Sequence, residues 1–161
     1  HISLDESVLD VGCGVGMLLD ILKPREVAGL DISPKAIEIL KSKGIQGKVG
    51  TLPKIDFPEK SFDVVVATET LEHLDDPISL IKEMIRVARK KVILSVPDAV
   101  LGPQEEKEHR QMFTKESFTK MLSSYFTEFE IEEFTDTFRT PTVNIALPTL
   151  LAVCEGRYLK Q

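Results

Sequence analysis

Residues 8–16 read Val-Leu-Asp-Val-Gly-Cys-Gly-Val-Gly, and a helix-forming segment from Met17 to Leu22 follows at once. The apolar run predicts a buried parallel strand, the alternating glycines predict a tight turn, and the next segment predicts a helix that begins under this turn. Glycine is needed where the backbone approaches a ligand without an intervening Cβ atom. The stretch therefore predicts a strand–turn–helix cradle for a nucleotide-like cofactor.

The spacing of the glycines narrows the choice of cofactor. The pattern is Gly12-x-Gly14-x-Gly16 with Asp10 in front of it, whereas the dinucleotide fingerprint is G-x-G-x-x-G and places a pyrophosphate on the helix N-terminus. A carboxylate beside the turn repels a pyrophosphate but accepts hydrogen bonds from an ammonium group. The stretch resembles motif I of the class I S-adenosylmethionine (SAM)-dependent methyltransferases. The alternative is a glycine turn of an α/β protein that binds no ligand.

The rest of the chain alternates short apolar runs with segments of helical periodicity, which is typical of α/β proteins. We predict one domain over residues 1–161, folded as a Rossmann-like doubly wound sheet of seven strands, mostly parallel, with one antiparallel strand near the C-terminus. Cap-and-proline or cap signals predict helices after Ser33, Asp76 and Thr114. The further strands are expected near residues 27–31, 47–50, 62–67, 92–96 and 129–131 and within 147–154. The basic cluster Arg86, Arg89, Lys90 and Lys91 is interpreted as the C-terminal end of the second of these helices.

Composition excludes several classes of function. The chain has 161 residues and a formal charge of −6, which weighs against nucleic acid as a partner. It holds no apolar run long enough to span a bilayer, and its first residues carry no signal-peptide pattern. The two cysteines, Cys13 and Cys154, form no metal-type cluster, so we expect no metal site and a reducing, cytoplasmic compartment.

Later motifs extend the resemblance over nearly the whole chain, in matching order. Residues 57–65 (FPEKSFDVV), residues 69–74 (ETLEHL) with Asp76 and Pro77, and residues 108–114 (EHRQMFT) are similar to signatures of the small-molecule branch of these enzymes, often called type 11 or 12 methyltransferases. There is no N/D-P-P-Y/F signature after the fourth predicted strand and no Pro-Cys pair. Methylation of DNA bases is therefore disfavoured.

The resemblance implies a set of cofactor-binding residues at the carboxyl ends of the strands. Asp31 is expected to accept the ribose hydroxyls, although an aspartate there also serves as a turn or helix cap. Ile32 and Leu52 are expected to flank the adenine, and Thr51 stands where the family usually carries an acid that binds the adenine amino group. The full expected set is Asp10, Gly12, Cys13, Gly14, Gly16, Asp31, Ile32, Thr51, Leu52, Thr68 and Glu69.

The activity implied is methyl transfer from SAM to a small-molecule acceptor by O- or N-methylation, with S-adenosylhomocysteine (SAH) as the product. His73 and His109 are the candidate general bases, because imidazole titrates near neutrality. The alternative for His73 is that the Glu-His pair only fastens its loop, and Glu69 and Glu72 are candidates to bind a cationic acceptor. A non-catalytic SAM-binding or regulatory domain and, less favoured, an NAD-dependent oxidoreductase remain as alternatives. We expect the helices that usually precede the first strand in this family to be missing before His1, and the acceptor and the oligomeric state stay open.

Overall fold

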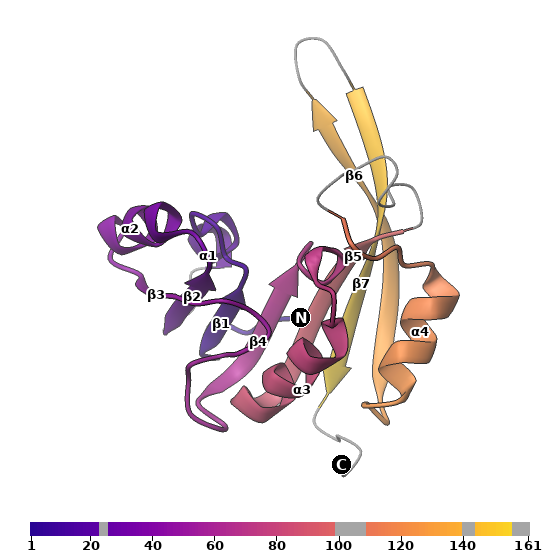
Figure 1. Cartoon of the computed structure of the whole chain (residues 1–161), viewed down its shortest axis with the longest axis horizontal. Helices are drawn as coiled ribbons and strands as arrows, with labels where there is room; N and C mark the ends of the chain where they lie inside the picture. The colour runs from indigo at the N-terminus through magenta and orange to yellow at the C-terminus, as the bar shows by residue number, and fades with distance from the viewer. Residues whose placement is uncertain (23–25, 99–108, 140–143, 156–161) are drawn as a thin grey trace.

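The computed structural model describes residues 1–22, 26–98, 109–139 and 144–155. They form a seven-stranded sheet with the strand order β3-β2-β1-β4-β5-β7-β6, flanked by helices (Figure 1). The strands are β1 (Val8–Val11), β2 (Val27–Asp31), β3 (Gln46–Val49), β4 (Phe62–Thr68), β5 (Ala88–Pro97), β6 (Phe129–Arg139) and β7 (Asn144–Glu155). The helices are α1 (Met17–Leu22), α2 (Pro34–Ser42), the 3₁₀ turn η1 (Leu71–His73), α3 (Pro77–Val87) and α4 (Lys115–Ser123).

The topology confirms the predicted fold class. Strands β3, β2, β1, β4 and β5 pair in parallel, and β7 runs antiparallel to both β5 and β6. The first five strands therefore end at one edge of the sheet, which is where ligands bind in doubly wound folds. In the part of the chain that the structure describes, no helix has the length and apolar composition to cross a membrane.

The alternation of side chains along the strands divides the core between the two faces of the sheet. Val8, Val64 and Val66 pack with Leu19 of α1 and with α2 on one face. Leu9 and its neighbours on the other face pack with α3 and α4, and Figure 1 shows these two helices on the side away from α1 and α2. All four residues of β1 are buried, as the apolar run predicted.

The predicted helix starts are confirmed by their hydrogen bonds. The Ser33 hydroxyl accepts from the Ala36 backbone at 3.3 Å, and the Asp76 carboxylate accepts from the Ser79 backbone at 3.1 Å. A proline follows each of these caps, where its fixed φ fits the first helical turn. Thr114 caps α4 in the same way, by accepting from the Ser117 backbone.

The interpretation of the basic cluster as a helix C-terminus is wrong for three of its four residues. Helix α3 ends at Val87, so only Arg86 lies in its last turn, while Arg89, Lys90 and Lys91 begin β5. Parallel pairing of β5 with β4 extends the strand backward to Ala88 and ends the helix early. The three cations pair with acidic side chains outside the helix: Arg89 and Lys90 with Asp63, each at 3.3 Å, and Lys91 with Glu6 at 3.1 Å.

Candidate active site

A cavity of about 350 Å³ opens at the edge of the sheet where the parallel strands end. Its walls come from the segments that follow β1, β2, β3 and β4, as a doubly wound sheet predicts. It is lined by Gly12, Asp31, Ile32, Thr51, Leu52, Glu69, Thr70, His73 and Leu74. Six of the residues expected to bind the cofactor are in this lining, together with His73. The other five, Asp10, Cys13, Gly14, Gly16 and Thr68, lie outside it.

The glycine turn has the backbone conformation that its sequence predicts. Gly12, Gly14 and Gly16 have φ angles of +81°, +50° and +83°, in the left-handed region that side chains disfavour. A Cβ atom at Gly12 would lie 2.6 Å from the Thr70 hydroxyl oxygen, and one at Gly16 would overlap Leu40. A Cβ at Gly14 would meet no protein atom within 4 Å. Packing inside the protein thus requires two of the glycines, and the third faces open space.

Asp31 joins this turn to the end of β2. Its carboxylate accepts the Gly14 and Ser33 backbone N–H groups, each at 2.8 Å. The turn-forming role of Asp31 is therefore present in the structure. Each carboxylate oxygen has a second lone pair, so the same side chain retains acceptors toward the cavity that it lines.

Asp10 is the buried carboxylate behind the turn. Its side chain is 2% exposed, and its Oδ1 atom has no hydrogen-bond partner among the described residues. Burial, with a contribution from the nearby charge of Asp31, raises the pKa of Asp10 to about 7. Cys13 is also buried, and burial raises the pKa of its thiol to about 12, so it packs as a neutral group. An unpartnered buried carboxylate oxygen suits a ligand that carries a cationic donor.

The end of β4 is held by a buried serine that sequence reasoning missed. Glu69 has a φ of +49°; its N–H donates to the Ser95 backbone oxygen at 3.1 Å, and the Ser95 hydroxyl donates to its carboxylate at 2.8 Å. The side chain of Thr70 is also held in position, because its hydroxyl donates to the Thr68 carbonyl at 2.9 Å. The signal for Ser95 was available: it is the one polar residue within Val92–Val96, an otherwise apolar run.

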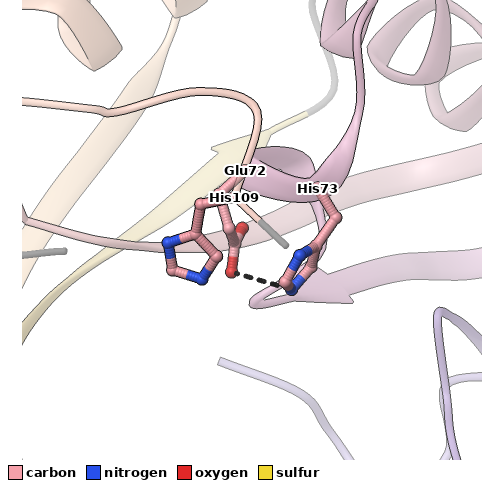
Figure 2. A group of neighbouring side chains, drawn as sticks. All are labelled: Glu72, His73 and His109. Atoms are coloured by element: carbon pink, nitrogen blue, oxygen red, sulfur yellow. Dashed lines mark ion pairs between the residues drawn. The ribbon is translucent and has the colours of Figure 1, made fainter. Parts of the chain in front are cut away.

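The structure brings His109 beside His73, which lines the cavity. The backbone oxygen of Glu72 accepts N–H groups from Arg110 at 2.6 Å and Gln111 at 3.0 Å, which holds the second segment beside η1. The two imidazole rings lie edge to face with their centroids 5.0 Å apart. Figure 2 shows the Glu72 carboxylate between them. Residues 99–108, which include Glu108 of the predicted motif, lie outside the described residues.

Glu72 is the buried member of this group. Its side chain is 2% exposed, its Oε2 atom has no hydrogen-bond partner among the described residues, and its Oε1 atom is 3.8 Å from His73 Nε2, too far for a hydrogen bond. Burial, with a smaller contribution from Glu69, raises the pKa of Glu72 to about 8. The sequence predicted Glu72 as a contact for a cationic acceptor or as part of a Glu-His pair that fastens its loop, and it did not predict the burial of this side chain.

Comparison with known proteins shows the family to which this chain belongs. A family model described as a methyltransferase domain matches residues 2–134. Ajmaline N-methyltransferase from Rauvolfia serpentina is 33% identical over 114 residues, which cover 62% of this chain and 39% of that protein. Ubiquinone biosynthesis O-methyltransferase from Hahella chejuensis is 36% identical over 91 residues, which cover 51% of this chain and 38% of that protein. The chain thus spans about two fifths of the length of these curated relatives.

A solved structure extends the likeness to the whole fold. Magnesium protoporphyrin IX methyltransferase from Synechocystis, determined with bound SAH, has a TM-score of 0.66 and 22% sequence identity. The superposition covers 93% of this chain and 74% of that one. At this level of identity the likeness concerns the arrangement of the sheet and helices.

Proposed function

This chain belongs to the class I SAM-dependent methyltransferases, and on that premise we propose that it transfers the methyl group of SAM to a small-molecule acceptor. The observation that carries the proposal is the glycine turn beside a buried carboxylate with a free oxygen. Gly12 of this turn and Asp31, which accepts a hydrogen bond from the turn, line the cavity. The turn lets a ligand come close to the backbone, and the carboxylate can pair with a cationic group of that ligand.

The residues present fit SAM in each of its parts. Asp10 is the partner for the ammonium group, since its buried Oδ1 atom has no hydrogen-bond partner in the part of the chain that the structure describes. Asp31 supplies acceptors for the ribose hydroxyls, and Ile32 and Leu52 supply apolar walls for the adenine. Thr51, which also lines the cavity, is the side chain for the adenine amino group. When bound, SAM supplies a methyl group activated by the positive sulfur atom.

The acceptor side of the site consists of Glu72, His73 and His109. His73 lines the cavity and His109 packs on it, so both imidazoles lie where an acceptor must enter. We infer that this group orients the acceptor and promotes loss of its proton, because a hydroxyl is a poor nucleophile until it is deprotonated. The free thiols of Cys13 and Cys154, both buried, support a reducing, cytoplasmic location.

Titration calorimetry with SAH, SAM and NAD tests the cofactor. We expect SAH and SAM to bind with one site per chain and NAD to give no heat. Binding of NAD without SAH would overturn the proposal in favour of an oxidoreductase. Methyl transfer is then followed with radiolabelled SAM on a panel of phenols, amines and carboxylates. SAH binding without transfer to any of them would identify the chain as a non-catalytic SAM-binding domain.

A further inference from the structure

We propose that the methyl acceptor is an amine that binds in its ammonium form, and that Glu69 is the carboxylate that holds it. This inference rests on the proposed methyl transfer, of which it names the substrate class. Glu69 lines the cavity and lies between β4 and η1, close in sequence to His73. The sequence named Glu69 both among the expected cofactor-binding residues and as a candidate for a cationic acceptor. We infer the second role from three features.

The first feature is the charge of the cavity wall. Within the described ranges, the lining residues include two carboxylates, Asp31 and Glu69, and no lysine or arginine. SAM carries an ammonium, a sulfonium and a carboxylate group, so it brings a single net positive charge, and its ammonium is already assigned to Asp10. The wall therefore keeps excess negative charge beside bound SAM, which attracts a cationic acceptor and repels a carboxylate or phosphate.

The second feature is the way in which Glu69 is held. Its φ of +49° lies in the left-handed region, which is costly for a residue with a Cβ atom and persists where the surrounding structure imposes it. The Ser95 hydroxyl donates to its carboxylate at 2.8 Å and accepts from its backbone N–H at 3.2 Å. A neutral hydroxyl stabilises a carboxylate without cancelling its charge. Ser95 is therefore a positioning residue that fixes a charged group at the cavity.

The third feature is a second carboxylate close to Glu69. Glu72 is 2% exposed, and its Oε2 atom has no hydrogen-bond partner among the described residues. Burial, with a smaller contribution from the charge of Glu69, raises the pKa of Glu72 to about 8. A cation held near two such carboxylates stabilises the ionised form of both. An ammonium group at Glu69 supplies that cation.

The same charges distinguish nitrogen from oxygen as the methylated atom. When an amine attacks, the positive charge that leaves sulfur appears on nitrogen, and a neighbouring carboxylate stabilises that charge as it develops. A hydroxyl must instead become an anion in order to attack, and a neighbouring carboxylate opposes that ionisation. Carboxylates at the cavity wall thus favour amines over phenols and alcohols.

The bound ammonium must lose a proton before it reacts, because its nitrogen has no lone pair. His73, which also lines the cavity, accepts this proton as a neutral imidazole and becomes an imidazolium beside the Glu72 carboxylate. The nitrogen lone pair then forms a bond to the methyl carbon of SAM, and the carbon–sulfur bond breaks with its electron pair going to sulfur. The product is an N-methylammonium ion, and the proton on His73 passes to solvent.

Binding of matched ligands tests the inference without turnover. Protein saturated with SAH is titrated by calorimetry with benzylamine, benzyl alcohol and benzoate, and then with 2-phenylethylamine and 2-phenylethanol. We expect each amine to bind at least about tenfold more tightly than its alcohol, and benzoate to bind more weakly than benzyl alcohol. No preference for the amines, including the absence of binding by every ligand, would overturn the inference.

Two variants test the residues that produce the preference. In Glu69→Gln, which keeps the shape of the side chain, we expect amine affinity to fall at least about tenfold and alcohol affinity to stay within about twofold. Ser95→Ala should lower amine affinity about fivefold, whereas a merely structural role would lower the affinity for both ligands. The matched control is Glu38→Gln, an exposed position on α2, which should bind both as the wild type does. Unchanged amine affinity in Glu69→Gln would overturn the role of Glu69.

Two further readouts separate this inference from the proposed function. SAH alone is expected to bind wild type and Glu69→Gln with affinities within about threefold of each other. A much larger loss in Glu69→Gln would assign Glu69 to the cofactor and overturn the inference. Transfer of radiolabel from SAM to phenols and to no amine would refute the amine acceptor and leave the methyltransferase assignment intact. Failure of the wild type to bind SAH would instead overturn the proposed function itself.

Discussion

Two buried carboxylates, Asp10 and Glu72, lie close in sequence to residues that line the same cavity, Gly12 and His73. Each is 2% exposed, each has one oxygen without a hydrogen bond among the described residues, and burial raises the pKa of each, to about 7 and about 8. Their surroundings differ. Asp10 precedes a turn of backbone amides and glycines, whereas Glu72 lies between two imidazoles.

The difference indicates that the two sides suit different parts of the proposed reaction. Backbone and carboxylates on the side of Asp10 suit an organic ammonium group, which needs hydrogen-bond acceptors. Imidazoles beside a carboxylate, on the side of Glu72, suit an acceptor that must lose a proton. In both places the folded chain keeps a carboxyl group whose ionisation is disfavoured by burial, which is common where a ligand completes a site.

Asp10→Asn gives the largest expected effect on stability. The pKa of Asp10 is higher in the folded than in the unfolded state, so the wild type loses stability as pH rises from about 4 to about 7 and no more above it. At pH 8 we expect the variant to be more stable by up to about 4 kcal/mol, with little gain at pH 4. Urea denaturation at both pH values measures this.

The control for this substitution is Asp5→Asn, since Asp5 is exposed. It should leave the free energy of unfolding nearly unchanged at both pH values. Although Asp10→Asn should be more stable than the wild type, its SAH affinity should fall at least tenfold, because the ammonium group loses its ionic partner. If the variant is stabilised and binds SAH as the wild type does, Asp10 does not bind the cofactor, and the contrast between Asp10 and Glu72 fails.

Asp31→Asn tests the link between the turn and the ribose. An amide oxygen accepts one of the two N–H groups that the carboxylate holds, and its NH₂ group faces the other. Hydrogen bonds to a charged acceptor contribute about 1.5–3 kcal/mol each, so we expect about 100-fold weaker SAH binding by calorimetry. Asp20→Asn, which alters an exposed ion pair with Lys43, should bind SAH as the wild type does.

Gly14→Ala, compared with Gly44→Ala, separates the effect of a Cβ atom close to the cofactor from the effect of backbone strain. Both glycines have a positive φ, and in both a Cβ would meet no protein atom within 4 Å. Each variant should lose about 1 kcal/mol of stability. Only Gly14→Ala should weaken SAH binding, by about tenfold. If the two variants bind SAH equally well, the turn does not approach the cofactor.

Thr51→Asp gives the smallest expected effect. The family usually carries an acid here, and Thr51 lines the cavity. A carboxylate is a stronger acceptor for the adenine amino group than a hydroxyl, so we expect SAH to bind about threefold more tightly. Thr51→Val, which removes the hydroxyl and keeps the shape, should weaken binding about twofold. The opposite order of the two variants would place the adenine elsewhere.

The fold was largely predictable because its signals are local. Apolar runs marked the strands, and Ser33, Asp76 and Thr114 marked the starts of three helices. The error at Arg89–Lys91 had a non-local cause, since pairing with β4 turns this segment into strand. Local charge patterning carries no information about such a partner.

The sequence by itself determined the residues and the turn of the proposed cofactor side of the site. Positive φ angles, a missing Cβ and an acid at a strand end are properties of residues within a few positions of one another, so the pattern from Val8 to Gly16 shows them directly. Only the tertiary structure decided the group of side chains on the proposed acceptor side. It buried Glu72 and placed His109 beside His73 through backbone hydrogen bonds between distant segments. Burial and desolvation depend on what packs around a group, and no local pattern contains that information.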